Sequence, residues 1–333
     1  MKLLTTPLLL ITLTALAGCA TRFVSPPTLD APETQYHATI VNADTATSLS
    51  VTDLAEAVAQ ADVVVVGEYH GHHGSHLLQS RLQAALYQQN PALVLTMEQF
   101  DQNRQRELDR YLAGETGEAE LIEDAGAWDN YRASYRPLIE FAKARAIPVI
   151  AANAPSQVVR CVGRQGPDYL DTLPADVRAQ LPANPFTDTP GYREKFVTAL
   201  AGGHSSGEAD MNERMQNTYK AQLLRDNVMA MQIQQARKRY PRHQILHLTG
   251  TFHSEERLGT VALLKQRAPE LGVVVLTPVF WPAGQSQPDI KAQRGKGDYL
   301  YFLQTLPKEY RDAERARAAM SVRFSQAKSA SCE

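Results

Sequence analysis

The stretch Ala61-Asp62-Val63-Val64-Val65-Val66-Gly67-Glu68 is a short apolar run that ends in a polar residue. A β-branched run of this length is typical of a strand that is buried on both faces of a sheet. Further runs of similar length follow, the last of which alternates more strongly between apolar and polar residues: Ala92–Glu98, Ile147–Asn153, Gly272–Phe280 and His243–Thr249. The sequence therefore predicts several strands of one sheet.

Helical patterns separate these strands, and the clearest are Ser75–Gln89, Asp101–Leu112 and Ser134–Ala146. Strands that alternate with helices predict an α/β fold, with a mainly parallel sheet covered by helices on both faces. The alternation stops within residues 167–241, where one long helical pattern runs from about Glu208 to Tyr240. We expect an inserted all-helical subdomain here, in a position where insertions often cover a site.

These patterns divide the chain. Residues 59–166 and 242–306 form the predicted α/β core, with residues 167–241 as the helical insertion. Asp298–Thr305 alternates like an edge strand, and residues 307–333 are predicted to be a charged terminal helix and a tail. Residues 19–58 are rich in Thr, Pro, Ala and Ser, which predicts a tether.

The beginning of the chain resembles a lipoprotein export signal. Lys2 precedes the apolar stretch Leu3–Leu16, and Leu16-Ala17-Gly18-Cys19 resembles a lipobox. Residues 1–18 would then be a cleaved signal peptide, and Cys19 would carry acyl chains such as palmitate, of which more than one is needed for stable anchoring. Ala20 follows the cysteine, which by resemblance to sorting rules predicts the outer membrane. We expect a lipid-anchored protein that faces the periplasm.

Composition limits the alternatives. A hydrophobic content of 44% and a charged content of 21% are ordinary for a globular protein. The formal net charge of −2 gives no support for nucleic-acid binding. Cys161 and Cys332 could pair in an oxidising compartment, but they are far apart in the sequence, which does not decide the matter.

Polar side chains follow four of the predicted strands. Glu68 and His70 come at the end of the first strand, Glu98 ends the second and Asn153 the third, and His253 comes shortly after the run His243–Thr249. The carboxyl ends of parallel strands meet at one edge of a sheet, where ligands bind. Two carboxylates and two imidazoles gathered there could bind a divalent or ferric ion.

Not every histidine is a candidate. His247 alternates inside a strand and is interpreted as a core residue, whereas Gly250 permits a tight turn that would aim His253 back at the sheet. In the loop after the first strand we select His70 alone and interpret the neighbouring histidines as part of a polar turn: His72, His73 and His76.

The inserted helix carries one further candidate. Asp226 is the only charged residue on a stripe formed by Tyr219, Leu223, Asp226, Ala230 and Ile233. A carboxylate on an apolar stripe needs a partner or must stay partly solvated. Either Asp226 pairs with an arginine of the core, or it faces the site beneath the insertion, and both interpretations stay open.

Five short motifs now stand in a family order: Gly67-Glu68-Tyr69-His70, Thr96-Met97-Glu98-Gln99-Phe100, Ala152-Asn153-Ala154-Pro155, Arg225-Asp226 ahead of Met229-Ala230, and Gly250-Thr251-Phe252-His253. With Trp128, Tyr131 and Tyr135 between the second and third strands, they resemble the ChaN family of haem-binding uptake lipoproteins, in the Tiki/TraB-like superfamily. The resemblance spans residues 61–276.

The resemblance implies an α/β domain with a helical subdomain, and haem bound in a pocket between the subunits of a homodimer. It also implies a role in haem-iron uptake, with haem passed to an outer-membrane receptor, and tyrosine as an iron ligand. Tyr69, beside the strand ends, and Tyr219, on the inserted helix, are the tyrosine candidates, and His70 is a third haem-contacting candidate.

The superfamily also has hydrolytic members, and these imply a competing function. In a metal-dependent peptidase or esterase, Glu68, His70, Glu98 and His253 would hold Mn, Co or Zn. Glu68 or Glu98 would then act as the general base on a metal-bound water, with Asn153 and Asp226 as supporting residues.

Overall fold

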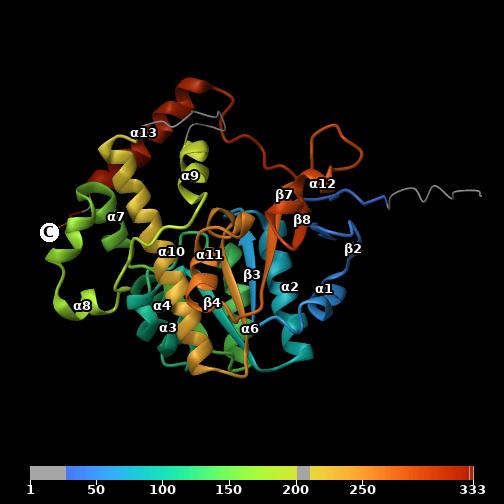
Figure 1. Cartoon of the computed structure of the whole chain (residues 1–333), viewed down its shortest axis with the longest axis horizontal. Helices are drawn as coiled ribbons and strands as arrows, with labels where there is room; N and C mark the ends of the chain where they lie inside the picture. The colour runs from blue at the N-terminus through green and yellow to red at the C-terminus, as the bar shows by residue number, and fades with distance from the viewer. Residues whose placement is uncertain (1–27, 201–210, 330, 333) are drawn as a thin grey trace, which may run out of the picture.

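The computed structural model describes residues 28–200, 211–329, 331 and 332. Its centre is an eight-stranded sheet with the order β2-β1-β8-β7-β3-β6-β4-β5 (Figure 1). The pairs from β8 to β5 are all parallel, whereas β1 pairs antiparallel with β2 and β8. The strands are β1 (Thr39–Asn42), β2 (Ser48–Leu49), β3 (Val63–Glu68), β4 (Leu93–Asp101), β5 (Val149–Asn153), β6 (Gln244–Gly250), β7 (Val273–Phe280) and β8 (Tyr299–Leu303).

The valine run forms β3 at the centre of the sheet, between β7 and β6. Val64 and Val66 face one apolar cluster, and Val63 and Val65 face another on the opposite side. Because successive side chains of a strand point to opposite faces, an unbroken valine run supplies both layers of the core. The α/β architecture predicted from this run is confirmed.

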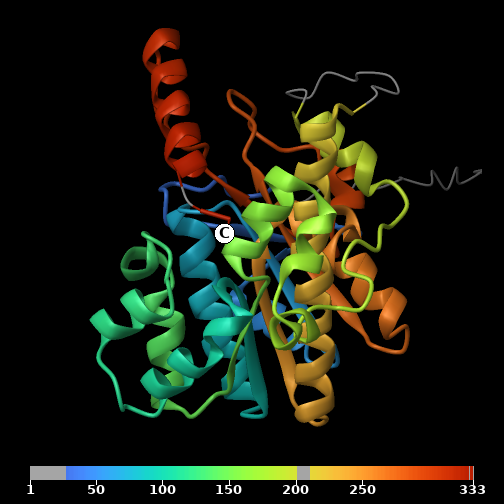
Figure 2. The same cartoon turned by 90° about the vertical axis from the view of Figure 1, so that its left-hand side faces the viewer.

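Helices cover both faces of the sheet (Figure 2). One face packs against α1 (Val51–Ala57), α2 (His73–Gln89), α3 (Gln105–Leu112) and α6 (Arg136–Ala144). The other packs against α10 (Glu213–Arg239) and α11 (Thr260–Arg267). The remaining helices are α4 (Glu118–Asp124), α5 (Tyr131–Ser134), α7 (Ser156–Gln165), α8 (Ala175–Ala179), α9 (Tyr192–Leu200), α12 (Ile290–Gln293) and α13 (Ala313–Ser329).

The described part of the insertion is helical, as its composition suggested. It contains the 3₁₀ helix Pro167–Thr172 together with α8, α9 and α10. Helix α10 begins at Glu213, where the Asn212 side chain caps it by accepting a hydrogen bond from the Met215 amide at 3.0 Å. Its apolar stripe packs on the sheet through Ala230 and Ile233, which brings Asp226 to the sheet's upper edge.

Two expectations about the ends of the sheet were wrong. The strand predicted as an edge, β8, is buried along its whole length because β1 pairs with it on the outer side. Strand β1 comes from residues 19–58, so the predicted tether is in part ordered structure: β1, β2 and α1 all lie within its described portion. Apolar Ile40 and Val41 are buried there, and a chain that buries such residues gains more from joining the sheet than from staying solvated.

The C-terminal helix α13 extends away from the sheet (Figure 2). Of residues 305–322, all are exposed except the half-buried Ala316 and Ala319. No helix in the described ranges is both long and apolar enough to cross a membrane. The predicted signal peptide and Cys19 lie outside the described residues.

Candidate functional site

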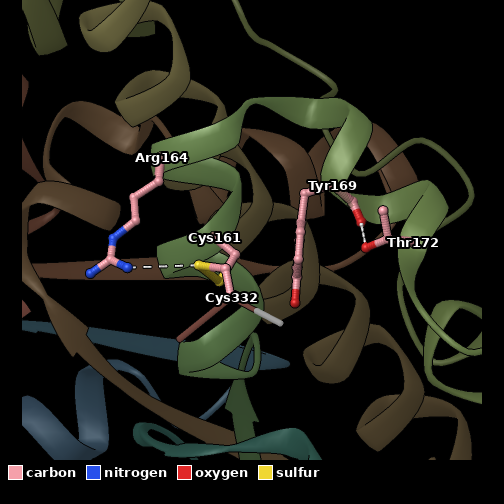
Figure 3. Close-up of a disulfide and its surroundings, with 5 residues drawn as sticks. All are labelled: Cys161, Arg164, Tyr169, Thr172 and Cys332. Atoms are coloured by element: carbon pink, nitrogen blue, oxygen red, sulfur yellow. Dashed lines mark hydrogen bonds between the residues drawn. A yellow bond between two sulfur atoms is a disulfide. The ribbon is translucent and has the colours of Figure 1, made fainter. Parts of the chain in front are cut away.

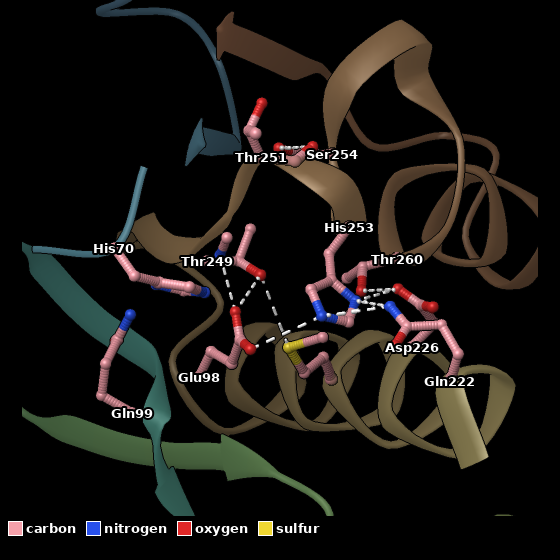
Figure 4. Close-up of polar contacts among 12 residues, drawn as sticks. His70, Glu98, Gln99, Gln222, Asp226, Thr249, Thr251, His253, Ser254 and Thr260 are labelled. Carbon is pink, nitrogen blue, oxygen red and sulfur yellow. Dashed lines mark hydrogen bonds and ion pairs between the residues drawn. The ribbon is translucent and has the colours of Figure 1, made fainter. Parts of the chain in front are cut away.

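The predicted polar side chains do gather at one rim of the sheet, where the parallel strands end (Figure 4). They form two separate hydrogen-bonded networks. The first is centred on Glu68 at the end of β3, and the second on Glu98 near the end of β4. The two carboxylates lie toward opposite faces of the sheet, since Gln79 of α2 contacts Glu68 and Asp226 of α10 belongs to the other network.

Glu68 is fully buried and accepts several hydrogen bonds. The Tyr135 hydroxyl donates to Oε1 at 2.6 Å, and the Gln79 amide donates to Oε2 at 2.6 Å. Gln99 donates to Oε1 at 3.2 Å, and the Nδ1 atom of His70 lies 2.8 Å from the same oxygen. A buried carboxylate with this many donors is held in one position, so Glu68 fixes the orientation of the His70 ring.

His70 is the exposed end of this network. Its side chain is 46% exposed, whereas that of Glu68 is 0% exposed. Burial alone would raise the pKa of Glu68, but the hydrogen bond from His70 and the charges of His76 and His70 outweigh it and lower the pKa. Burial lowers the pKa of His70, and the hydrogen bond to Glu68 and the charges of Glu98 and Glu68 more than reverse this. The pair is therefore a carboxylate beside an imidazole that gains protons readily.

The second network is closed to solvent. His253 is 6% exposed and lies between two carboxylates, with Nδ1 2.8 Å from Asp226 Oδ1 and Nε2 3.5 Å from Glu98 Oε1. Asp226 also accepts hydrogen bonds from Tyr192 at 2.6 Å and Thr260 at 2.8 Å. Asp226 thus faces the site beneath the insertion, which decides between the two interpretations left open by the sequence.

His253 is positively charged in this environment. Burial lowers its pKa, but the charges of Asp226 and Glu98 and their hydrogen bonds raise it to about 10. Burial raises the pKa of Glu98, and the His253 charge and hydrogen bond, with the Gly250 amide 2.6 Å from Oε2, bring it well below its usual range. A histidine whose two nitrogens both face carboxylates is an ion-pair partner and has no lone pair to offer a metal.

Gly250 separates the two networks. A Cβ atom there would lie 2.7 Å from His70 Nε2 and 3.6 Å from Glu98 Oε2. The expected reason for this glycine was a tight turn, but its φ of −57° is open to any residue. The correct reason is space, because the His70 ring packs directly against the backbone of β6.

The metal reading finds no support in this geometry. Among the described residues, no three His, Cys, Asp or Glu side chains are arranged to hold a metal ion. Glu68 and His70 bond to each other, and Glu98 and His253 do the same across the Gly250 backbone. The four predicted ligands therefore share a rim but satisfy one another in pairs.

The two predicted tyrosine ligands both have partners. The Tyr69 hydroxyl donates to the Pro278 carbonyl at 3.2 Å, and burial and the charge of Glu255 raise its pKa to about 12. Tyr219 is 4% exposed, and its hydroxyl donates to Asp188 at 2.7 Å. Burial and this hydrogen bond raise the pKa of Tyr219 still further. Neither oxygen points into an open cavity.

The remaining candidates play supporting parts. Asn153 is buried, and its Oδ1 has no hydrogen-bond partner in the described structure. His247 is a core residue with Nδ1 2.9 Å from the Thr96 hydroxyl, and burial lowers its pKa to about 4. His72 caps α2, and His76 lies 3.7 Å from Glu68, so His76 belongs to the site although the sequence argument set it aside.

Two cavities open at this rim, on either side of the loop Ala125–Asn130. The smaller, of about 490 Å³, is lined by His70 and Trp128. The larger, of about 750 Å³, adjoins the ends of β4 and β5 and is lined by Arg104, Val158 and Tyr169, among others. Tyr169 is 8% exposed, and its hydroxyl has no hydrogen-bond partner among the described residues. This oxygen, unlike those of Tyr69 and Tyr219, is available to a ligand.

A disulfide closes one side of the larger cavity (Figure 3). Cys161 of α7 bonds to Cys332, whose Cα lies 5.6 Å from that of Cys161. Cys161 and Tyr169 belong to one apolar cluster, against which Cys332 packs, and Cys332 also lines the cavity. The pairing that the sequence left undecided is thus present, and it brings the C-terminus to the site.

Several functional side chains escaped the sequence argument. Gln79 and His76 lie one helical turn apart on α2, so a polar face on an otherwise apolar helix was the available signal. Tyr135 appeared only as part of the family resemblance, and its bond to Glu68 joins residues 67 positions apart. Tyr169 lies in an irregular segment with no periodicity, and nothing in its local sequence distinguishes it.

The site and fold together define the class: an α/β protein with carboxylate–imidazole networks and a ligand-sized cavity at the carboxyl rim of a parallel sheet. A family model described as haem-binding uptake, Tiki superfamily, ChaN matches residues 54–264. The chain therefore belongs to this family, as its motifs predicted. No curated protein matches the chain significantly.

Solved structures show the same fold. ChaN of Campylobacter jejuni, solved with cofacial haem, is 18% identical with a TM-score of 0.57, and the match covers 80% of this chain and 97% of that one. A Bacillus cereus protein is 11% identical with a TM-score of 0.45, covering 83% and 95%. An erythromycin esterase mutant in its open conformation is 12% identical with a TM-score of 0.45, covering 86% and 87%.

Proposed function

We propose that this protein binds haem and takes part in haem-iron uptake as a lipoprotein of the outer membrane. Membership of the haem-binding family directs the proposal. One observation carries it to a place on this chain: the free hydroxyl of Tyr169 in a cavity of about 750 Å³. Tyrosine oxygen is an established protein ligand of haem iron.

The residues around Tyr169 fit the chemistry of haem. Val158, Leu173 and Val177 line the cavity and offer apolar contacts to a porphyrin. Arg104 is an exposed cation on the same lining, and guanidinium groups pair well with carboxylates such as propionates. Bound haem would supply the iron chemistry, while these side chains hold and orient it.

Haemin titration of the protein expressed from residue 20 onward tests this assignment. We expect a Soret band that saturates at a fixed stoichiometry, and a loss of at least about tenfold in affinity for Tyr169→Phe. Tyr69→Phe and Tyr219→Phe are the matched controls, because each removes a hydroxyl that already has a protein partner. A Tyr169→Phe titration identical to that of the parent protein would contradict the ligand assignment.

The smaller cavity needs its own arm of the same titration. His70→Ala removes the half-exposed imidazole beside Trp128 without touching the larger cavity. If haem spans the rim, or lies between two subunits of a homodimer, this variant weakens binding as well. Light scattering with and without haemin then reports whether the haem-bound form is a dimer.

The anchor is proposed from the lipobox alone, and it has a separate test. Radiolabelled palmitate should enter the full-length protein and fail to enter a Cys19→Ala variant. Membrane fractionation should place the labelled protein in the outer membrane. Label in the variant, or parent protein in the soluble fraction, would contradict the anchor while leaving haem binding unaffected.

A hydrolase is the second candidate function, because Glu68 and His70 form a carboxylate–imidazole pair at the rim. A carboxylate that orients a histidine supports its action as a general base, and this pair needs no metal. Hydrolysis of a p-nitrophenyl ester, lost in His70→Ala and kept in His73→Ala, would favour this function. His73 is the matched control since it is an exposed histidine three residues away. Absence of hydrolysis above the buffer rate would remove the candidate.

A further inference from the structure

The C-terminal end of the chain returns to the rim through a single covalent link. Residues 305–322 are almost entirely exposed, and α13 stands clear of the sheet. Cys332, by contrast, is half-buried and bonded to Cys161 of α7. The disulfide therefore holds a segment whose described residues bury little surface of their own.

This link lies beside the residue to which haem binding is assigned. Cys332 lines the same cavity as Tyr169, and Cys161 belongs to the apolar cluster that holds the Tyr169 ring (Figure 3). A side chain that forms part of a cavity wall restricts the passage of a ligand. Opening the disulfide would remove that part of the wall without cutting any contact of the sheet.

We propose that the Cys161–Cys332 disulfide is a redox latch on the larger cavity, and that it controls how fast haem enters and leaves. This inference rests on the proposed function, since it places haem against Tyr169. A dithiol of the oxidoreductase or small-molecule class opens the latch. The dithiol gives up two electrons and two protons and becomes a disulfide, while Cys161 and Cys332 become thiols. Reoxidation by a disulfide of the same class closes the latch.

The direction of the effect follows from the positions of the two sulfurs. Cys161 is fully buried within α7 and stays in place after reduction, whereas Cys332 is two-sided, with one face on the cavity and the other on the apolar cluster. The moving part is thus the C-terminal segment. The closed form should release haem slowly, and the open form should exchange it quickly.

Haem release into excess apomyoglobin measures the latch. The oxidised protein is compared with Cys161→Ala/Cys332→Ala, a variant that removes both thiols and so leaves no new sulfur ligand for iron. We expect release at least about tenfold faster in the variant, because differences between related complexes appear mainly in dissociation rates. Met320→Ala is the matched control, since it alters exposed α13 and keeps the disulfide.

A second arm guards against misfolding of the double variant. Folded oxidised protein is reduced with a phosphine and its thiols are alkylated with iodoacetamide before haem loading. Hydrogen exchange of the haem-free protein is then followed in α7 and in Pro167–Thr172. Faster exchange there, with unchanged exchange in β3 and β6, supports the latch without any use of haem.

The outcomes separate the two proposals. Saturable haemin binding with equal release rates in the oxidised and open proteins overturns the latch and leaves haem binding standing. An absence of saturable binding in every protein overturns the proposed function, and the hydrogen-exchange arm then decides the latch by itself. Unchanged exchange in α7 after reduction overturns the latch in either case.

Discussion

Two networks of carboxylate and imidazole share one rim of the sheet, and they differ in where their charge ends. The Glu68 network leads to His70, which is 46% exposed, whereas the Glu98 network surrounds His253, which is 6% exposed. Both carboxylates are buried and ionised. The first network presents an imidazole to a cavity, and the second holds one between α10 and the strand ends.

The difference teaches that the same residue types at equivalent strand ends can take opposite roles. Neutral donors such as Tyr135 and Gln79 hold Glu68, so its charge does not depend on His70 alone. Glu98 and Asp226 instead share one cation, His253, in a site with little solvent. We therefore expect the second network to matter mainly for stability and the first mainly for chemistry at the surface.

Removal of His253 should have the largest effect on this comparison. His253→Ala leaves Glu98 and Asp226 buried without their cation, and breaking a buried ion pair in this way costs about 3–5 kcal/mol. We expect the free energy of unfolding from urea titration to fall by that amount. A loss below about 1 kcal/mol would show that the network is not a structural clamp.

The pH dependence of stability should expose the same cation. The pKa of His253 is raised from 6.5 to about 10, so its stabilising contribution is complete below pH 6.5 and is lost as the pH rises toward 10. The free energy of unfolding should fall by up to about 1.4 kcal/mol per pH unit within that window. A His253→Gln variant should show a flatter profile, and parallel profiles would contradict the assignment.

Filling the space between the networks should have a moderate effect. Gly250→Ala places a methyl group 2.7 Å from His70 Nε2. We expect a loss of about 1 kcal/mol in stability, at the lower end for overpacking, because the exposed ring can swing outward. Swinging would break its bond to Glu68, so the imidazole resonances of His70 should shift by NMR while those of His253 stay in place.

Truncation of His70 should have the smallest effect on stability. In His70→Ala the Glu68 carboxylate keeps Tyr135, Gln79 and Gln99 as donors, and the lost partner is half exposed. We expect the free energy of unfolding to change by less than about 1 kcal/mol, against several for His253→Ala. Equal losses for the two variants would erase the distinction between the networks.

The sequence predicted the sheet and the rim because those features depend on local patterns. The valine run at residues 63–66 carries its burial in its composition, and the polar residues at strand ends follow from chain direction alone. Its errors came where pairing is non-local. Strand β8 looked like an edge until β1, more than 250 residues earlier, covered it.

The sequence by itself determined the fold class, the family and the set of acidic and imidazole residues at one rim. Only the tertiary structure decided which of them pair, that Asp226 faces His253, that Gly250 is needed for space, and that Tyr169 and Cys332 meet at one cavity. The physical reason is range: strand burial is a property of adjacent residues, whereas a hydrogen bond or a cavity wall joins side chains that the chain order keeps far apart.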